Sequence, residues 1–199
     1  MPANLWEIEN DLHREGYRLI CGVDEAGRGP LAGPVCAAAV ILPQGLEIPG
    51  LNDSKKLTEK KRELLFPQIQ ELAESWSVAF ATVEEIEERN ILRATFLAMN
   101  RAIAGLKLRP ELALIDGNQN REIEVPSRTV VHGDAICASI AAASVLAKVS
   151  RDRLMLELAG RYPEYGFEQH KGYGTKAHYE ALRKYGPSPV HRMSFLKNL

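Results

Sequence analysis

Residues 21–33 read Cys-Gly-Val-Asp-Glu-Ala-Gly-Arg-Gly-Pro-Leu-Ala-Gly and connect two apolar segments of the 199-residue chain. The first segment, residues 19–23, has the composition of a buried strand, and residues 35–42 form the second. Two strands joined by a glycine-rich turn are therefore predicted. Asp24 and Glu25 end the first strand, and adjacent strand residues point to opposite faces. We expect these carboxylates to converge only if the chain leaves strand geometry there, which the glycines of the turn permit.

Outside this stretch the chain alternates helical and strand patterns, which predicts an α/β domain. Helices are expected over residues 1–16, 58–75 and 175–184, and over residues 83–106 in one or two pieces. Strands are expected over residues 76–83, 112–115 and 128–131. Thr58 is the expected N-cap of its helix, with an interruption or kink near Pro67. Residues 134–159 are rich in alanine and nearly free of helix breakers, so one long helix is predicted there.

Composition places the protein among ordinary soluble domains. Hydrophobic residues make up 45% and charged residues 26% of the chain, which is typical of globular proteins. No apolar run reaches the roughly 18 residues of a membrane span, and the first residues are too acidic for a signal peptide. A cytoplasmic protein without membrane contact is expected. Cys21, Cys36 and Cys137 are odd in number and lie in apolar contexts, so free buried thiols are predicted.

Charge is unevenly distributed along the chain. The formal net charge is −1; residues 1–145 contain 15 basic and 21 acidic residues, and residues 146–199 contain 10 and 5. A basic C-terminal quarter beside an acidic body suits a site that holds metal ions and a polyanion together. The alternative is chance unevenness of a solvated surface.

Carboxylates recur where apolar strands end. Asp24 and Glu25, Asp116, and Asp134 each follow such a strand, and neighbouring strands lie only about 5 Å apart. Four clustered carboxylates would select a hard cation such as Mg²⁺ or Mn²⁺. Asp116 alone could be a turn former, and Asp134 could cap a helix. Asp152 would lie about 27 Å beyond Asp134 along the predicted helix, so we expect it outside the cluster and paired with a neighbouring arginine.

The glycine-rich turn does not fit a dinucleotide-binding loop. Its glycine spacing differs from that motif, and a strand follows it instead of a helix. Residues Gly27-Arg28-Gly29 instead offer backbone amides beside the carboxylates, suited to a sugar hydroxyl or a phosphate oxygen.

Seven segments together resemble the type 2 ribonucleases H, the bacterial ribonuclease HII family. Among them are Leu-Asn-Asp-Ser-Lys-Lys-Leu at 51–57, His-Lys-Gly-Tyr-Gly-Thr at 170–175 and Ser-Pro-Val-His-Arg-Met-Ser-Phe at 188–195. The others are residues 22–35, 114–117, 133–135 and 138–153. Each segment alone is weak evidence, but their order and spacing are specific, and the match covers nearly the whole chain.

This resemblance implies an RNase H-like fold, with a mixed central sheet flanked by helices and a small helical C-terminal portion. Residues 1–159 would form the catalytic domain, and residues 160–199 would complete the substrate cleft. The implied activity is endonucleolytic cleavage of RNA in RNA–DNA hybrids and at single ribonucleotides in duplex DNA. Two Mg²⁺ or Mn²⁺ ions per site would support this hydrolysis, leaving 3′-hydroxyl and 5′-phosphate ends. We expect a monomer.

The resemblance also implies roles for individual residues. Asp24, Glu25, Asp116 and Asp134 match the family's four metal-binding carboxylates. The Gly27-Arg28-Gly29 loop would read the ribose, and Tyr173 would pack on the following sugar, although Tyr165 lies in a similar loop. Further contacts with the nucleic acid are expected from Ser54, Lys55, Lys56, Ser139, Ser144, Lys148 and Lys171.

Two alternatives belong to other functional classes. One is a hybrid-binding module that does not cut, against which the retention of all four carboxylates speaks. The other is a metal-dependent DNA nuclease of the same broad fold, against which the Gly-Arg-Gly loop and the tyrosine segment speak.

Overall fold

The structure is a computed structural model that describes residues 5–52, 54 and 56–197. Its centre is a five-stranded sheet in the order β3-β2-β1-β4-β5. The strands are β1 (Ile20–Ala26), β2 (Val35–Ile41), β3 (Ser75–Ala81), β4 (Leu112–Asp116) and β5 (Ser127–Val130). Strands β1, β2 and β3 pair antiparallel, while β4 runs parallel to β1 and to β5. The predicted mixed central sheet is therefore confirmed.

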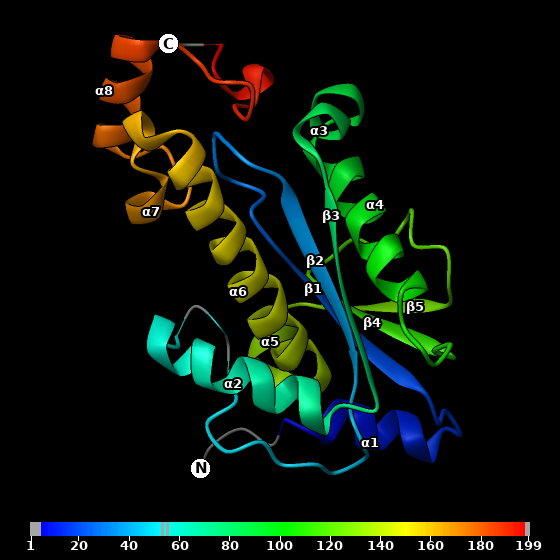
Figure 1. Ribbon diagram of the computed structural model, residues 1–199. Coiled ribbons are helices and arrows are strands. Elements are labelled where there is room, and N and C mark those ends of the chain that lie inside the picture. Colours follow the sequence, from blue (N-terminus) through cyan, green and yellow to red (C-terminus); the bar gives the residue numbers. More distant parts are fainter. Residues whose placement is uncertain (1–4, 53, 55, 198–199) are drawn as a thin grey trace.

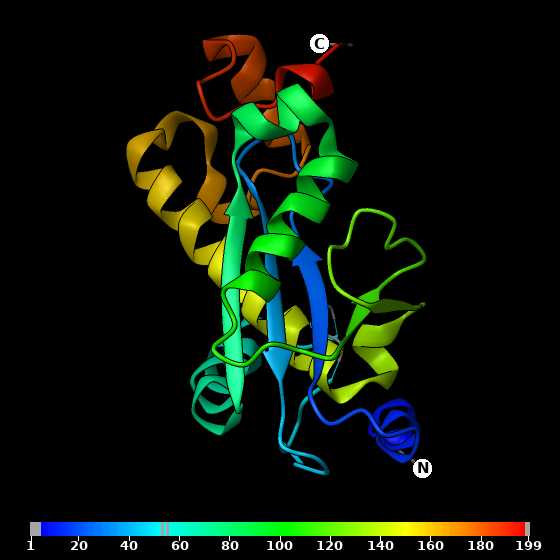
Figure 2. The same cartoon turned by 90° about the vertical axis from the view of Figure 1, so that its right-hand side faces the viewer.

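Helices cover both faces of this sheet. The long helix α6 (Ala138–Arg161) crosses one face with α2 (Glu59–Leu72) beside it, and α3 (Val83–Arg89) and α4 (Ile91–Ala104) cover the other (Figures 1 and 2). Every residue of β2 is buried, because alternate side chains face the two helical layers. Cys36, Ala38 and Val40 join the core under α6, and Ala37 and Ala39 join the core under α4. The small side chains of β2 let both layers pack closely.

The C-terminal elements gather at the end of the sheet where the β1–β2 loop lies (Figure 1). They are η1 (Pro163–Tyr165), α7 (Phe167–His170), α8 (Lys176–Tyr185) and η2 (Met193–Phe195). Leu31 of the loop donates its backbone N–H to the Gly172 carbonyl, and Arg192 donates its own to the Leu31 carbonyl, both at 2.8 Å. A small helical C-terminal portion is thus present, and it is attached to the loop between the first two strands.

The single helix predicted for residues 134–159 is wrong, because the chain breaks at Cys137. Helix α5 (Gly133–Ile136) ends there, Cys137 is extended with φ −132° and ψ 123°, and α6 begins at Ala138. The start of α6 is capped by Glu9 of α1 (Glu7–Arg14), whose buried carboxylate accepts the N–H groups of Ala138 and Ser139 at 3.3 and 2.9 Å. A cap supplied from 130 residues away leaves no trace in the local sequence.

The other predicted helices are present, with ends that differ by a few residues, and one predicted segment forms two helices. Thr58 caps α2 by accepting the Lys61 N–H at 3.3 Å, as predicted, and α2 continues through Pro67. The segment 83–106 is divided at Asn90, where φ is +70° and the side chain accepts the N–H of Leu92 at 3.0 Å.

Two expectations drawn from composition can be compared with the structure. Cys21, Cys36 and Cys137 are buried free thiols, as predicted. Burial raises the pKa of Cys21 to about 12, so this thiol is inert at neutral pH. Among the described residues, no helix combines the length and the apolar character needed to cross a membrane.

Candidate metal centre and the adjoining pocket

Three aspartates meet where β1, β4 and α5 come together. One carboxylate oxygen each from Asp24, Asp116 and Asp134 lies within 4.8 Å of the other two. Val23 pairs with Ile115 in the parallel ladder, so Asp24 and Asp116 follow side by side on neighbouring strands. Asp24 and Asp134 are only 5% and 4% exposed. The predicted meeting of carboxylates at strand ends is observed for these three residues.

Two glycines allow the third aspartate to approach. A Cβ atom at Gly22 would lie 2.2 Å from the backbone nitrogen of Ile140, so β1 and the start of α6 can touch only because this residue has no side chain. A Cβ atom at Gly133 would lie 2.5 Å from Ile140 Cδ1 and 3.3 Å from Asp116 Oδ1. The sequence analysis missed Gly22, although a glycine inside an apolar strand is a signal of close backbone approach.

Glu25 lies outside this group of three. The sequence analysis required the chain to leave strand geometry for Asp24 and Glu25 to converge, yet β1 stays paired with β2 as far as Ala26. The pleat therefore turns Glu25 toward α4, where it lines a small pocket with Leu92 and Phe96. Its carboxylate lies 3.5 Å from Arg28 Nη1.

The cluster is electrostatically strained without a cation. Burial raises the pKa of Asp24 well above its usual range, and the neighbouring charges of Glu25, Asp116 and Asp134 raise it further. The Asp24 carboxylate accepts the Glu25 N–H at 2.7 Å, which acts in the opposite direction. Carboxylate oxygens are hard donors that suit Mg²⁺ or Mn²⁺. The three aspartates can therefore hold a divalent cation, which would relieve their mutual repulsion.

A pocket of about 220 Å³ opens beside the aspartates. Its acidic side is formed by Asp24, Glu25 and Asp116, and its other side by Gly27-Arg28-Gly29, Ser54, Lys148 and Tyr173. Gly27 has φ +96°, and a Cβ atom there would lie 1.9 Å from Arg151 Nε, so both conformation and space require glycine. A Cβ atom at Gly29 would lie 3.7 Å from Tyr173 Cε1. The loop and the tyrosine therefore lie next to each other on the wall of the pocket.

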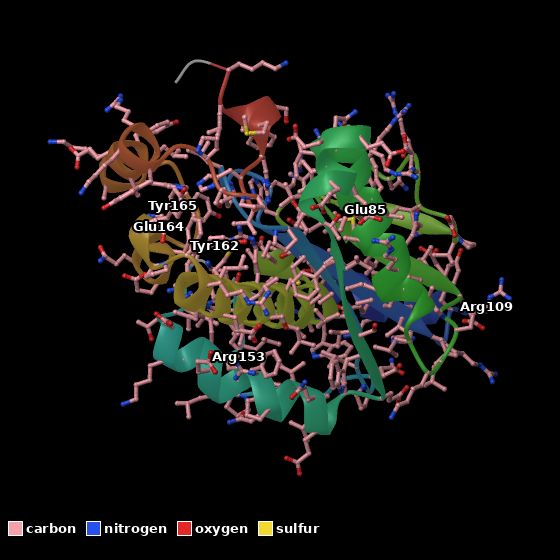
Figure 3. All side chains as sticks on the ribbon, turned by 45° about the horizontal axis from the view of Figure 1, so that its top comes forward. Glu85, Arg109, Arg153, Tyr162, Glu164 and Tyr165 are labelled. Carbon is pink, nitrogen blue, oxygen red and sulfur yellow. The ribbon has the colours of Figure 1, made fainter. Side chains whose placement is uncertain are left out.

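The structure distinguishes between the two candidate tyrosines. Tyr173 is 44% exposed and lines the pocket. Tyr165 is 4% exposed and donates its hydroxyl to the Gly186 carbonyl at 2.7 Å; Figure 3 shows it beside Tyr162, where α6 meets the C-terminal elements. Of the two, Tyr173 is the tyrosine at the pocket.

Lys148 reaches the pocket from α6 as an ion-paired side chain. Its Nζ donates to Asp152 Oδ1 at 2.7 Å, and Arg62 of α2 lies 4.0 Å from the other oxygen of Asp152. Asp152 is outside the group of three aspartates, as predicted, but its closest partner is a lysine and its arginine comes from another helix. Arg62 also donates to the carbonyl of Ser54 at 2.9 Å, so the same network supports two pocket residues.

Ser139 and Ser144 do not face a bound duplex, and this prediction is wrong. Each is 2% exposed. The Ser139 hydroxyl donates to Glu9 at 2.7 Å, and that of Ser144 donates to the Ala141 carbonyl at 2.9 Å. Both lie on the small-residue face of α6, which packs against the sheet, so their hydroxyls are used inside the protein.

Lys56 and Lys171 do not line the pocket. Lys56 is exposed on the loop before α2, and Lys55 is outside the described residues. Lys171 turns its ammonium group back to the Glu168 carbonyl at 2.5 Å.

Known proteins share both the sequence and the fold. Residues 21–198 match the sequence model of the ribonuclease HII family. A ribonuclease HII of Caldicellulosiruptor bescii is 55% identical over 196 residues, which cover 98% of this chain and 95% of that protein. A ribonuclease HII of Dechloromonas aromatica is 60% identical over 177 residues, covering 89% and 90%. The crystal structure of ribonuclease H2 from Pyrococcus horikoshii superposes with a TM-score of 0.75 at 27% identity, covering 89% and 93%.

Proposed function

Because the chain belongs to the ribonuclease HII family, a family of nucleases, we propose that it is an endonuclease acting on two substrates. It would cleave RNA in RNA–DNA hybrids and at single ribonucleotides embedded in duplex DNA, leaving 3′-hydroxyl and 5′-phosphate ends. The observation that carries this proposal is the group of three aspartates, with oxygens within 4.8 Å of one another, beside a pocket lined by Gly27–Gly29 and Tyr173.

Asp24, Asp116 and Asp134 would hold the metal, and Glu25 would contribute from the edge of the group. Mg²⁺ or Mn²⁺, two ions per site, would supply activation of the attacking water and charge stabilisation at the leaving 3′ oxygen. Asp24, the most enclosed by other carboxylates, is the candidate to bridge two ions. The protein's own contribution is to hold these oxygens in place before the substrate arrives, through the paired strands and the close approach of α5.

The loop and the tyrosine would select the sugar. Backbone amides of Gly27-Arg28-Gly29 would contact a ribose 2′-hydroxyl, the group that separates RNA from DNA. Tyr173 would pack its ring on the sugar that follows. Both lie on the wall of the same pocket as Asp24, which is why recognition and hydrolysis would act on adjacent groups of the substrate.

Phosphates on either side would be held by basic and polar residues. Ser54 and Lys148 border the pocket and are the best placed of these residues. Lys55, Lys56 and Lys171 would contact the duplex outside it. The C-terminal portion, residues 160–199, would complete the cleft, and the protein would act as a cytoplasmic monomer.

Incision of a DNA duplex that contains one ribonucleotide tests this proposal. We expect a single cut beside the ribonucleotide with Mg²⁺ or Mn²⁺ and none in EDTA. No incision with either ion would contradict the proposal. Binding without cutting would instead indicate a hybrid-binding module, and equal cutting of an all-DNA duplex would indicate a DNA nuclease.

A further inference from the structure

Two adjacent residues near the C-terminus connect to two parts of the pocket wall, the Gly27–Gly29 loop and Tyr173. Arg192 contacts the loop Gly27–Gly33, and His191 connects through His178 to Tyr173. We propose that residues 188–192, here termed the tail segment, are a positioning element that sets the separation between the Gly27–Gly29 loop and Tyr173. This inference rests on the proposed function, since it assigns a role within that same site.

Arg192 fixes the loop Gly27–Gly33 through hydrogen bonds from its guanidinium group. Its side chain is fully buried, and its three guanidinium nitrogens donate to three carbonyls: Nη2 to Gly27 at 2.6 Å, Nη1 to Arg28 at 2.9 Å and Nε to Gly33 at 2.9 Å. In a trans peptide the C=O and the following N–H point in opposite directions. Drawing the carbonyls of residues 27 and 28 toward the guanidinium therefore directs the N–H groups of Arg28 and Gly29 away from it, and both residues line the pocket.

The cost of burying a guanidinium makes this arrangement specific. A buried cation is tolerated only when its donors are hydrogen-bonded, and the planar fork of arginine suits three fixed acceptors better than the point charge of lysine does. Any other loop conformation would remove acceptors from Arg192. The arginine therefore selects the conformation in which the loop amides face the pocket.

His191 holds Tyr173 through a chain of hydrogen bonds whose direction can be deduced. Ser188 can only donate its backbone N–H, so Nδ1 of His191 accepts it at 3.0 Å. Nε2 of neutral His191 then carries the proton and donates to Nε2 of His178 at 2.9 Å. Nδ1 of His178 in turn donates to the Tyr173 carbonyl at 2.9 Å. Each donor meets an acceptor only when both imidazoles are neutral.

The tail segment also links the Gly27–Gly33 loop to Tyr173. His191 forms a β-bridge with Ala32, and the loop residue Gly33 donates its N–H to the Val190 carbonyl at 2.8 Å. The ring of Tyr173 lies within 3.7 Å of the Cβ position of Gly29. The loop and the tyrosine are thus fixed by neighbouring residues of one short segment, although they are more than 140 residues apart in sequence.

Substitution of Arg192 by lysine tests the loop side, because it keeps the charge and removes the fork. We expect kcat/KM on the ribonucleotide-containing duplex to fall about 10-fold or more, while the rise in Tm on adding Mn²⁺ stays as in the wild type. Selectivity for a 2′-hydroxyl over a 2′-fluoro group at the same nucleotide should fall with it. The matched control is Tyr165→Phe, which loses one hydrogen bond in the C-terminal portion and keeps every contact of the loop. Unchanged selectivity in Arg192→Lys would overturn the inference.

Hydrogen exchange separates this inference from the proposed function, because it needs no activity. In Arg192→Lys the amides of Leu31 and Gly33 should exchange faster, with little change at Tyr173. In His191→Gln the amide of Tyr173, which donates to the His170 carbonyl, should exchange faster instead. Uniform acceleration across the protein in both variants would mean a general loss of stability and would overturn the inference, even if the wild type cleaves its substrate.

If Arg192→Lys does not fold, an NMR measurement on the wild type still tests the inference. Couplings across the hydrogen bonds, from the Arg192 side-chain nitrogens to the carbonyl carbons of residues 27 and 28, should be detectable by NMR. Their absence would contradict the inference, whereas absence of cleavage by a wild type that shows these couplings would contradict only the proposed function.

Discussion

The aspartate group and the tail segment both bury ionisable side chains, but the aspartates face like charges whereas the arginine is hydrogen-bonded to main-chain carbonyls. At the aspartates, like charges face one another, and burial together with its neighbours raises the pKa of Asp24. At the tail, the guanidinium groups of Arg192 and Arg151 are buried side by side, yet their six side-chain bonds all end on main-chain carbonyls.

This difference separates a site that needs a ligand from one that does not. Carbonyl dipoles satisfy the arginines within the folded chain, so removing an arginine should cost stability. The aspartates repel one another, and the proposed cation would relieve this repulsion, so removing one aspartate should stabilise the metal-free fold and abolish the proposed cleavage. Natural active sites often sacrifice stability in this way.

The largest expected effect tests the acidic side of this comparison. Asp24→Asn should lower cleavage by about 100-fold or more, which is ~2.7 kcal/mol of lost transition-state stabilisation, because a metal oxygen is lost. The same variant should raise the Tm measured in EDTA, because one buried like charge is removed. Cleavage assays and thermal denaturation check both results. Asp134→Asn should behave in the same way; near-normal turnover in either variant would remove that residue from the metal centre.

The close contact between Gly22 of β1 and Ile140 of α6 should have the next largest effect, on both stability and activity. Gly22→Ala places a Cβ atom 2.2 Å from the Ile140 nitrogen, so α6 must shift, at a cost of about 3 kcal/mol in unfolding free energy. The shift would also move Asp134 away from Asp24 and lower activity. Gly160→Ala is the matched control on α6, because nothing lies within 4 Å of its Cβ position; it should stabilise the protein by about 0.5–1 kcal/mol. Urea denaturation measures both variants, and equal effects would contradict the close contact.

The two charged regions should also respond to pH in opposite directions. Burial lowers the pKa of His191 from 6.5 to about 4, so the unfolded state binds a proton that the folded state does not. Stability from this residue is complete above pH 6.5 and is lost as the pH falls toward 4, by up to about 3 kcal/mol. The raised pKa of Asp24 has the opposite effect: its contribution to the unfolding free energy of the metal-free protein becomes more favourable as the pH falls.

The difference between wild type and His191→Gln isolates the histidine. In EDTA, the wild type should lose more unfolding free energy than this variant between pH 7 and pH 4.5. The titratable groups that face His191 are His178 and His170, both from the C-terminal elements. Parallel curves for the two proteins would show that His191 does not titrate in this range.

The smallest effects compare two neighbouring positions of α6. Lys148→Met should raise KM several-fold and weaken its salt dependence, because a cation at the pocket is lost. Ser144→Ala should change stability by less than about 0.5 kcal/mol, since its hydroxyl bonds only within the helix, and should leave KM unchanged. Steady-state kinetics at two salt concentrations measure both. A raised KM in Ser144→Ala would contradict the packing role given to this serine.

Much of the fold and of the candidate metal centre was accessible from the sequence, because it depends on local patterns. Continuous apolar runs located the strands, Thr58 marked the start of α2, and carboxylates after strands located Asp24, Asp116 and Asp134. These features depend on residues that are close in sequence, or on the fact that strand ends meet at one edge of a sheet.

Features that depend on distant partners could not be found in this way. The break at Cys137 depends on Glu9, the burial of Ser139 and Ser144 depends on which face of α6 meets the sheet, and the loop at residues 27–33 is held by Arg192. Nor could the sequence tell that β1 keeps its pairing with β2 through Ala26, which directs Glu25 to the α4 side of the pocket and leaves it outside the group of three aspartates.

Sequence alone therefore marked the three aspartates as candidate ligands, whereas tertiary structure decided which of the predicted polar residues meet at the pocket. The physical reason is that hydrophobic periodicity and turn chemistry act over a few residues, while the burial and pairing of a polar side chain depend on whatever the fold brings to it. Asp24 and Arg192 illustrate the two cases. The position of Asp24 after an apolar strand marked it as a ligand, but only the folded chain reveals that Arg192 lies beneath the loop beside it.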